Sequence, residues 1–117
     1  MMAYALVVED DAEIARFVEL VLQETAFEVA VVYDGQAALD QLAARPPNLV
    51  LLDLNLPKVS GLEVLHHIRQ TAALADVRVI VISANPHMVD QAYDEADLIL
   101  QKPISYDQLR DLVRRFG

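Results

Sequence analysis

The sequence alternates five times between a short apolar run and a longer segment in which apolar residues recur three and four positions apart. The short runs, at residues 3–8, 28–32, 48–52, 77–82 and 98–101, are of strand length, and the segments between them have helical periodicity. Parallel strands need crossover helices, so this alternation predicts an α/β sandwich with a parallel sheet. The first, third and fourth runs are nearly continuous Val, Ile and Leu, as expected for strands covered on both faces. The second contains Glu28 and Ala30 and is predicted to be an edge strand.

Each helical segment begins near a residue that favours a helix start. The predicted openings are Asp11, Asp34-Gly35, Ser60-Gly61, a point near Pro86, and Ser105. Asp11 is therefore interpreted as serving the first helix, and the pair Arg114-Arg115 as complementing the dipole at the end of the last one. Tyr93, in the fourth segment, is interpreted as an edge residue of the core.

Length and charge restrict the classes of function. A chain of 117 residues fits one domain, expected to span 1–117. The net charge of −9 disfavours binding of nucleic acid or an anionic membrane by this domain. The chain has no cysteine, which suits a cytoplasmic protein and excludes thiolate metal sites. Neither a transmembrane segment nor a signal peptide is recognisable.

Charged and hydroxyl side chains follow the predicted strands. Glu9 and Asp10 follow the first strand, Asp53 the third, Ser83 the fourth and Lys102 the fifth. In a doubly wound sheet, ligands bind beyond the carboxyl ends of the strands, so these groups are expected to converge at one rim.

Three of these side chains are acidic, and Lys102 offsets only one of the three charges. Two carboxylates about 4 Å apart repel by roughly 4 kcal/mol at an effective dielectric constant of 20, so such a site requires a cation. The ligands are all oxygens, which favours Mg²⁺. Asp53 is then a candidate nucleophile for a phosphoryl group, with Lys102 and the hydroxyl of Ser83 as contacts to the phosphoryl oxygens.

The chain resembles the receiver domain of bacterial two-component response regulators from Tyr4 to Phe116. Four strings carry the resemblance: the segments 6–11, 53–61 and 81–84, and Lys102-Pro103. The resemblance implies a flavodoxin-like, doubly wound, five-stranded parallel sheet with strand order 2-1-3-4-5 and five helices.

The resemblance also implies roles for these residues. Asp53 would accept the phosphoryl group from a sensor histidine kinase, a phosphotransfer protein or a small donor such as acetyl phosphate. Asp10, Asp53 and the backbone carbonyl of Asn55 would bind Mg²⁺ directly, and Glu9 through water. The domain would be a regulatory phosphoacceptor, catalysing only its own phosphorylation and dephosphorylation, and would act on a downstream protein or output domain.

Further implications concern the phosphoryl group itself. Ser83 and Lys102 would contact it, and Lys102-Pro103 would be a cis peptide. Asn55 and Asn85 occupy positions that influence the lifetime of the phosphate in the family. The sequence leaves homodimerisation open.

Two features depart from the family pattern. Ile99 stands three residues before the lysine, where an aromatic residue is usual, and the stretch from Ser83 to Lys102 is about three residues short, close to one helical turn. These departures leave open an alternative, a receiver-like interaction module that works without phosphorylation.

Two other interpretations are less favoured. A phosphatase or flavin carrier on the same fold would need a second aspartate at position 55, or a loop rich in Gly, Ser and Thr after the first strand, and neither is present. His66 and His67 are adjacent, so they cannot face a common metal from a helix and are interpreted as solvated.

Overall fold

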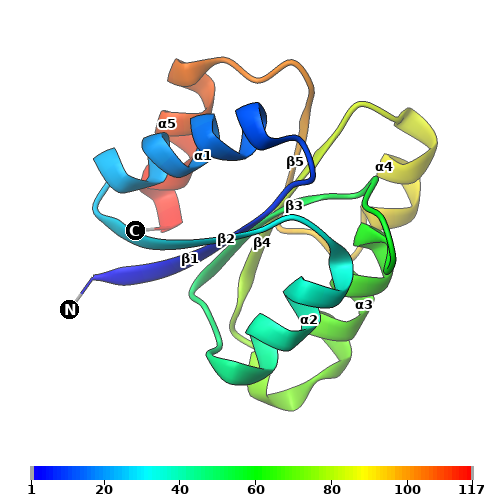
Figure 1. The fold of residues 1–117 in the computed structure, drawn as a ribbon. Helices are drawn as coiled ribbons and strands as arrows, with labels where there is room; N and C mark the ends of the chain where they lie inside the picture. The colour runs from blue at the N-terminus through cyan, green and yellow to red at the C-terminus, as the bar shows by residue number, and fades with distance from the viewer. Residues whose placement is uncertain (1, 117) are drawn as a thin grey trace.

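The computed structural model describes residues 2–116 and contains a five-stranded parallel sheet (Figure 1). The strand order is β2-β1-β3-β4-β5, as the resemblance implies. The strands are β1 (Ala3–Val8), β2 (Phe27–Val32), β3 (Leu49–Asp53), β4 (Arg78–Ser83) and β5 (Leu98–Gln101). The prediction that the second strand lies at an edge is confirmed.

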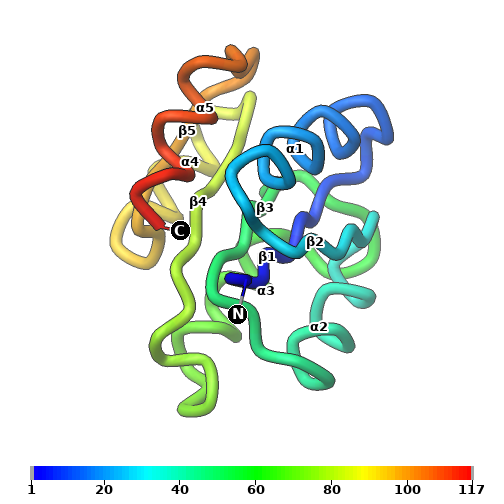
Figure 2. The backbone as a smooth tube through the Cα atoms, turned by 90° about the vertical axis from the view of Figure 1, so that its left-hand side faces the viewer, coloured from blue at the N-terminus to red at the C-terminus, as the bar shows by residue number. Residues whose placement is uncertain are grey.

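Five α-helices cover the two faces of the sheet. They are α1 (Ala12–Glu24), α2 (Gly35–Ala44), α3 (Gly61–Gln70), α4 (Pro86–Ala92) and α5 (Tyr106–Val113), with 3₁₀ turns at Ala72–Leu74 and Arg114–Phe116. Helices α1 and α5 lie on one face, and α2, α3 and α4 lie on the other (Figure 1). Helices α1 and α5 lie side by side (Figure 2). Tyr106 of α5 donates a hydrogen bond to Glu24 at the end of α1.

The helix starts follow the predicted caps. The side chains of Asp11, Asp34, Ser60 and Ser105 each accept a hydrogen bond from a backbone N–H in the first turn of the helix that follows. Asn85 does the same for α4. These caps satisfy donors that have no partner within the helix, so the sequence determines where each helix begins.

Three strands differ from their predicted limits by one residue. Strand β2 begins at Phe27, because that residue pairs in register with Ala3. Strand β3 ends at Asp53, which pairs with Ile82, and β4 ends at Ser83, which pairs with Gln101. Two polar residues of the predicted site therefore belong to the sheet itself, which fixes their backbones more firmly than a loop would.

The sheet separates two apolar cores. On one face Leu6 and Leu52 of the sheet are buried in one cluster with Leu65 of α3. On the other, Val7 and Leu51 pack against α1 and α5. The interior strands are buried on both faces, as their apolar composition predicts.

Strand β2 is held at its outer edge by a charged pair. Arg45, after α2, donates hydrogen bonds of 3.1 and 2.6 Å to the two carboxylate oxygens of Glu28. The same guanidinium lies 3.9 Å from the centre of the Tyr4 ring. Glu28 thus has a bidentate partner, although it occupies a strand.

Arg69 on α3 anchors the segment that leads into β5. Its guanidinium donates hydrogen bonds to the carbonyls of Glu95 (2.7 Å) and Val77 (2.8 Å) and to the carboxylate of Asp97 (2.8 Å). Asp97 also accepts a 2.7 Å hydrogen bond from the N–H of Val79 in β4. The loop between α4 and β5 is therefore attached to α3 and β4.

The interpretation of Tyr93 as a core-edge residue is wrong. It follows α4 and 73% of its surface is exposed, because the helix is short and buries Ala92 instead. His66 and His67 are exposed on α3, as expected. Among the described residues, no helix has the length and apolar character needed to cross a bilayer.

Replacing Arg69 should destabilise the fold more than removing a neighbouring arginine. We expect Arg69→Ala to lower the free energy of unfolding by about 2 kcal/mol, since three hydrogen bonds, one of them to a charged partner, are lost. Arg78→Ala is the matched control, because Arg78 is largely exposed and its ion pair with the same Asp97 is longer, at 3.5 Å. This variant should change the free energy of unfolding by less than about 0.5 kcal/mol. Urea unfolding of both variants tests this, and equal losses would contradict the anchoring role of Arg69.

Candidate functional site

The strand order brings the predicted site residues to one rim of the sheet. Glu9 follows β1, Asp53 ends β3, and these strands are neighbours. Ser83 ends β4, and Lys102 follows β5. One oxygen from each of Glu9, Asp10 and Asp53 lies within 4.8 Å of the others. The expected convergence of the acidic residues is confirmed.

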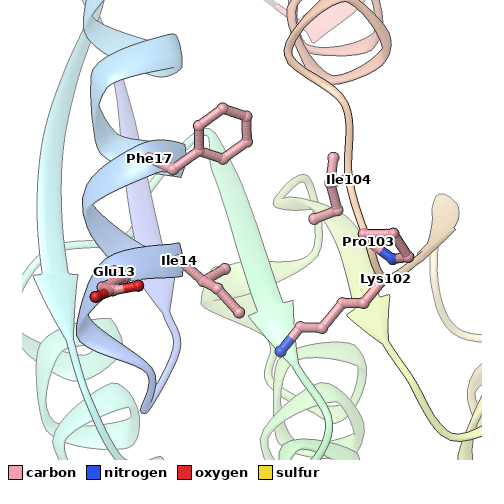
Figure 3. A pocket seen from close by; sticks show the side chains of 6 residues that line it. All are labelled: Glu13, Ile14, Phe17, Lys102, Pro103 and Ile104. Atoms are coloured by element: carbon pink, nitrogen blue, oxygen red, sulfur yellow. The ribbon is translucent and has the colours of Figure 1, made fainter.

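Lys102 crosses the rim to reach two of these carboxylates. Figure 3 shows its side chain extending from the segment after β5 toward Ile14 of α1. Its Nζ lies 2.8 Å from Oε1 of Glu9 and 3.4 Å from Oδ2 of Asp53. Partial burial lowers the pKa of Lys102, but its contact with Glu9 and the charge of Asp53 outweigh that effect, so the pKa is raised and the ammonium form is favoured.

Glu9 is the most perturbed carboxyl group of the site. It is 3% exposed, and its Oε2 accepts a 3.2 Å hydrogen bond from the N–H of Asp11. Burial, and then the hydrogen bond and charge of the neighbouring Asp53, raise the pKa of Glu9 to about 7 despite the opposing effect of Lys102. One lysine therefore does not compensate two buried carboxylates, and the site attracts further positive charge.

The residues fit a bound divalent cation. Oε1 of Glu9 is shielded from solvent and accepts no hydrogen bond from residues 2–116. The ammonium of Lys102 is close enough to this oxygen for an ion pair but lacks hydrogen-bond geometry. Beside it are oxygens of the exposed Asp10 and the buried Asp53. This set consists of hard oxygen donors and carries excess negative charge, which is the chemistry that Mg²⁺ selects.

Asp53 is held by the loop that follows it. Its Oδ1 accepts a 3.1 Å hydrogen bond from the N–H of Asn55. The N–H of Gly61, at the start of α3, donates a 3.0 Å hydrogen bond to the carbonyl of Leu54. A β-carbon at Gly61 would lie 2.3 Å from the carbonyl oxygen of Asp53, so only glycine permits this approach.

Ser83 occupies the same rim but is engaged locally. Its Oγ accepts a 3.0 Å hydrogen bond from the N–H of Asn85 and is 3.3 Å from the carbonyl oxygen of that residue. A role in binding a phosphoryl group would require the hydroxyl to rotate. The peptide bond Lys102-Pro103 is cis, as the resemblance implies.

An apolar groove that sequence reasoning missed opens beside Lys102. It has a volume of about 480 Å³ and lies between α1 and the segment after β5 (Figure 3). Its apolar walls include Ile14, Phe17 and Ile104. Ile14 and Phe17 have the helical spacing of core residues, so periodicity alone could not show that they border an opening.

The two departures from the family pattern lie together. Helix α4 contains seven residues. Ile99 in β5 is partly buried against the α2, α3 and α4 core, and with Tyr93 it borders a small hollow beside β5. An aliphatic side chain therefore occupies the place of the usual aromatic residue, and the exposed aromatic group lies at the end of α4.

The fold and the acidic rim are those of a receiver domain, and a comparison with protein families agrees. The sequence model of the response regulator receiver domain matches residues 5–114, so the chain belongs to this family.

Relatives and solved structures support this assignment. The chain is 34% identical to the response regulator ArlR of Staphylococcus saprophyticus, aligning over 97% of the chain and 51% of the relative. The phosphorylated cyanobacterial phytochrome response regulator RcpA is similar in structure, with a TM-score of 0.84, 31% identity, and coverage of 98% of this chain and 91% of that one. The Mn²⁺-bound form of response regulator Rcp1 gives a TM-score of 0.81, 33% identity, and coverage of 97% and 90%. The chain spans about half the length of the curated relatives that it matches.

Replacing Lys102 should make the domain depend more on a divalent cation. In EDTA, we expect Lys102→Met to lower the free energy of unfolding by about 2 kcal/mol, because the buried carboxylates of Glu9 and Asp53 lose the ammonium group that they share. Mg²⁺ affinity should rise at least about tenfold, since a competing charge is removed. Arg78→Met also removes one positive charge, at an exposed position at the opposite end of β4 from Ser83, and should do neither. Thermal unfolding with and without Mg²⁺ tests this, and the expectation fails if both variants respond alike.

Proposed function

We propose that this domain takes a phosphoryl group onto Asp53 in a reaction that depends on Mg²⁺, and so controls a partner in two-component signalling. The observation that carries the proposal is the buried carboxylate of Asp53, which shares Lys102 with Glu9 and lies beside Asp10. A nucleophile, a cation-binding set and a fixed ammonium group at one rim are the parts that phosphoryl transfer requires.

In the proposed step, one oxygen of the Asp53 carboxylate attacks the phosphorus of the donor. A P–O bond forms while the bond between phosphorus and its leaving group breaks. The electron pair goes to the carboxylate oxygen of acetyl phosphate, or to the ring nitrogen of a phosphohistidine. Lys102 places its ammonium against the oxygens of the transferred group, and Ser83 donates its hydroxyl hydrogen once it rotates away from Asn85.

Asp10, Asp53 and the backbone carbonyl of Asn55 would hold Mg²⁺ directly, with Glu9 acting through water. When bound, the ion neutralises the charge of the carboxylates and of the phosphoryl oxygens. Two similar proteins support this assignment, since one structure contains Mn²⁺ and another is phosphorylated.

The proposed donor is a histidine kinase or a phosphotransfer protein. The groove formed by Ile14, Phe17 and Ile104 adjoins Lys102 and offers an apolar surface to such a donor. Residues 1–117 are proposed to form one receiver domain. Its output is proposed to be a downstream protein or a further domain, because the curated relatives are about twice as long.

Incubation with acetyl phosphate should add the mass of one phosphoryl group to the intact protein. The gain should require Mg²⁺ and disappear in Asp53→Ala, because the acceptor oxygen is lost. Asp40→Ala, an exposed position on α2, is the matched control and should be phosphorylated normally. A Mg²⁺-dependent gain that persists in Asp53→Ala would place the phosphoryl group on another residue.

A second function is favoured by Ile99 and the seven-residue α4. The domain would then be a receiver-like interaction module whose partner recognises a single state without phosphorylation. A folded protein that binds Mg²⁺ and gains no mass, from acetyl phosphate or from kinases, would support this alternative.

If phosphorylation does switch the domain, we expect the signal to pass without rotation of an aromatic residue at position 99. Beryllofluoride, which mimics the phosphoryl group, should change NMR shifts around the phosphoacceptor loop and on surfaces other than α4, β5 and α5. The reason is that Ile99 is partly buried against the core and has no aromatic ring that could rotate between a buried and an exposed rotamer. Large shifts confined to α4, β5 and α5 would contradict this expectation.

A further inference from the structure

The first turn of α2 lies directly against the loop that follows Asp53. The N–H of Gly35 donates a long hydrogen bond of 3.4 Å to the carbonyl of Pro57. A β-carbon on Gly35 would lie 1.8 Å from the carbonyl oxygen of Val59 and 2.8 Å from its β-carbon. No L side chain fits in that space, so the loop backbone takes the position that a side chain would occupy.

The same loop is closed on its other side by the start of α3. The N–H of Gly61 donates a hydrogen bond to the carbonyl of Leu54. A β-carbon on Gly61 would clash with the backbones of Asp53 and Leu54. Between these contacts Lys58 has a φ of 66°, in the left-handed region that a lysine seldom adopts. The loop is therefore held in an unfavourable backbone shape by two helix starts.

The ion pair near this contact is too weak to hold the loop. Nζ of Lys58 is 3.5 Å from Oδ2 of Asp34, and the lysine side chain is 67% exposed. Exposed pairs of this kind contribute little. The close approach of backbone at Gly35 is therefore the contact that sets where residues 57–59 lie.

We infer that Gly35 is a positioning residue for the metal site. By letting the loop rest on α2, it keeps the backbone of Asn55 in place. The N–H of Asn55 orients Asp53, and in the proposed function its carbonyl would bind the cation. The inference rests on the proposed function, since it assigns Gly35 to the Mg²⁺ site described there. Residues that orient metal ligands without touching the metal commonly affect affinity.

The test compares Gly35→Ala with Gln36→Ala, which makes a substitution to alanine one position later on the exposed side of α2. Mg²⁺ alone is titrated by calorimetry, and thermal unfolding is measured separately in EDTA. Gly35→Ala should weaken Mg²⁺ binding about tenfold, at the lower end of what such changes produce, whereas Gln36→Ala should stay within about twofold.

A Gly35→Ala protein that melts at a lower temperature but binds Mg²⁺ as the unmodified protein does would overturn the inference, because the glycine would then serve only stability. Failure of the unmodified protein to bind Mg²⁺ would instead refute the metal site of the proposed function. The two failures are thus distinguishable.

A measurement on the unmodified protein covers the case in which Gly35→Ala does not fold. Coupling between two sites is reciprocal, so Mg²⁺ should in turn tighten the loop against α2. We expect Mg²⁺ to slow solvent exchange of the Gly35 amide severalfold in NMR experiments, and to leave the amide of Tyr106, at the start of α5, unchanged. An unchanged exchange rate at Gly35 in the Mg²⁺-bound protein would overturn the inference.

Discussion

The sharing of Lys102 between two buried carboxylates is the interaction on which the site depends. Glu9 and Asp53 come from the adjacent strands β1 and β3, and Lys102 follows the edge strand β5. Their meeting therefore requires the order β1-β3-β4-β5. Burial, together with the neighbouring Asp53, raises the pKa of Glu9, and one of its oxygens accepts no hydrogen bond from residues 2–116. The two carboxylates exceed the single ammonium by one charge. Folding thus produces a pocket that is electrostatically incomplete, and in the proposed function a cation and an anionic phosphoryl group would complete it together.

Contacts elsewhere in the fold hold the residues of this pocket in place. Asp53 and Ser83 are residues of the sheet. Gly35 and Gly61, the first residues of α2 and α3, allow the backbone of the loop after Asp53 to pack closely against both helices. Arg69 attaches the α4–β5 segment to α3, whose first residue contacts that loop. The loop after Asp53 is therefore connected to β5 through α3 and the hydrogen bonds of Arg69.

Much of this arrangement could be predicted from the sequence. Apolar runs and capping residues gave the element types, and polar residues after strands indicated the rim, because both signals are local. The exposure of Tyr93 could not be predicted, since the end of α4 depends on how a short helix docks and not on its periodicity. The contact between Gly35 and Val59 joins residues 24 positions apart in different elements, and no pattern in either segment encodes it. The groove beside Lys102 was hidden for the same reason.

The ion pair between Glu28 and Arg45 lies at the β2 edge of the sheet, and this position affects how two copies of the domain could associate. An outermost strand exposes backbone groups that can pair with a strand of another molecule. Glu28 lies in that strand, and Arg45 donates two hydrogen bonds to its carboxylate. Charged side chains on an outermost strand disfavour such pairing, and Glu28 with Arg45 places an ion pair beside this edge. The contact that joins the end of α2 to β2 thus also makes this edge of the sheet a poorer template for the strand of a second copy.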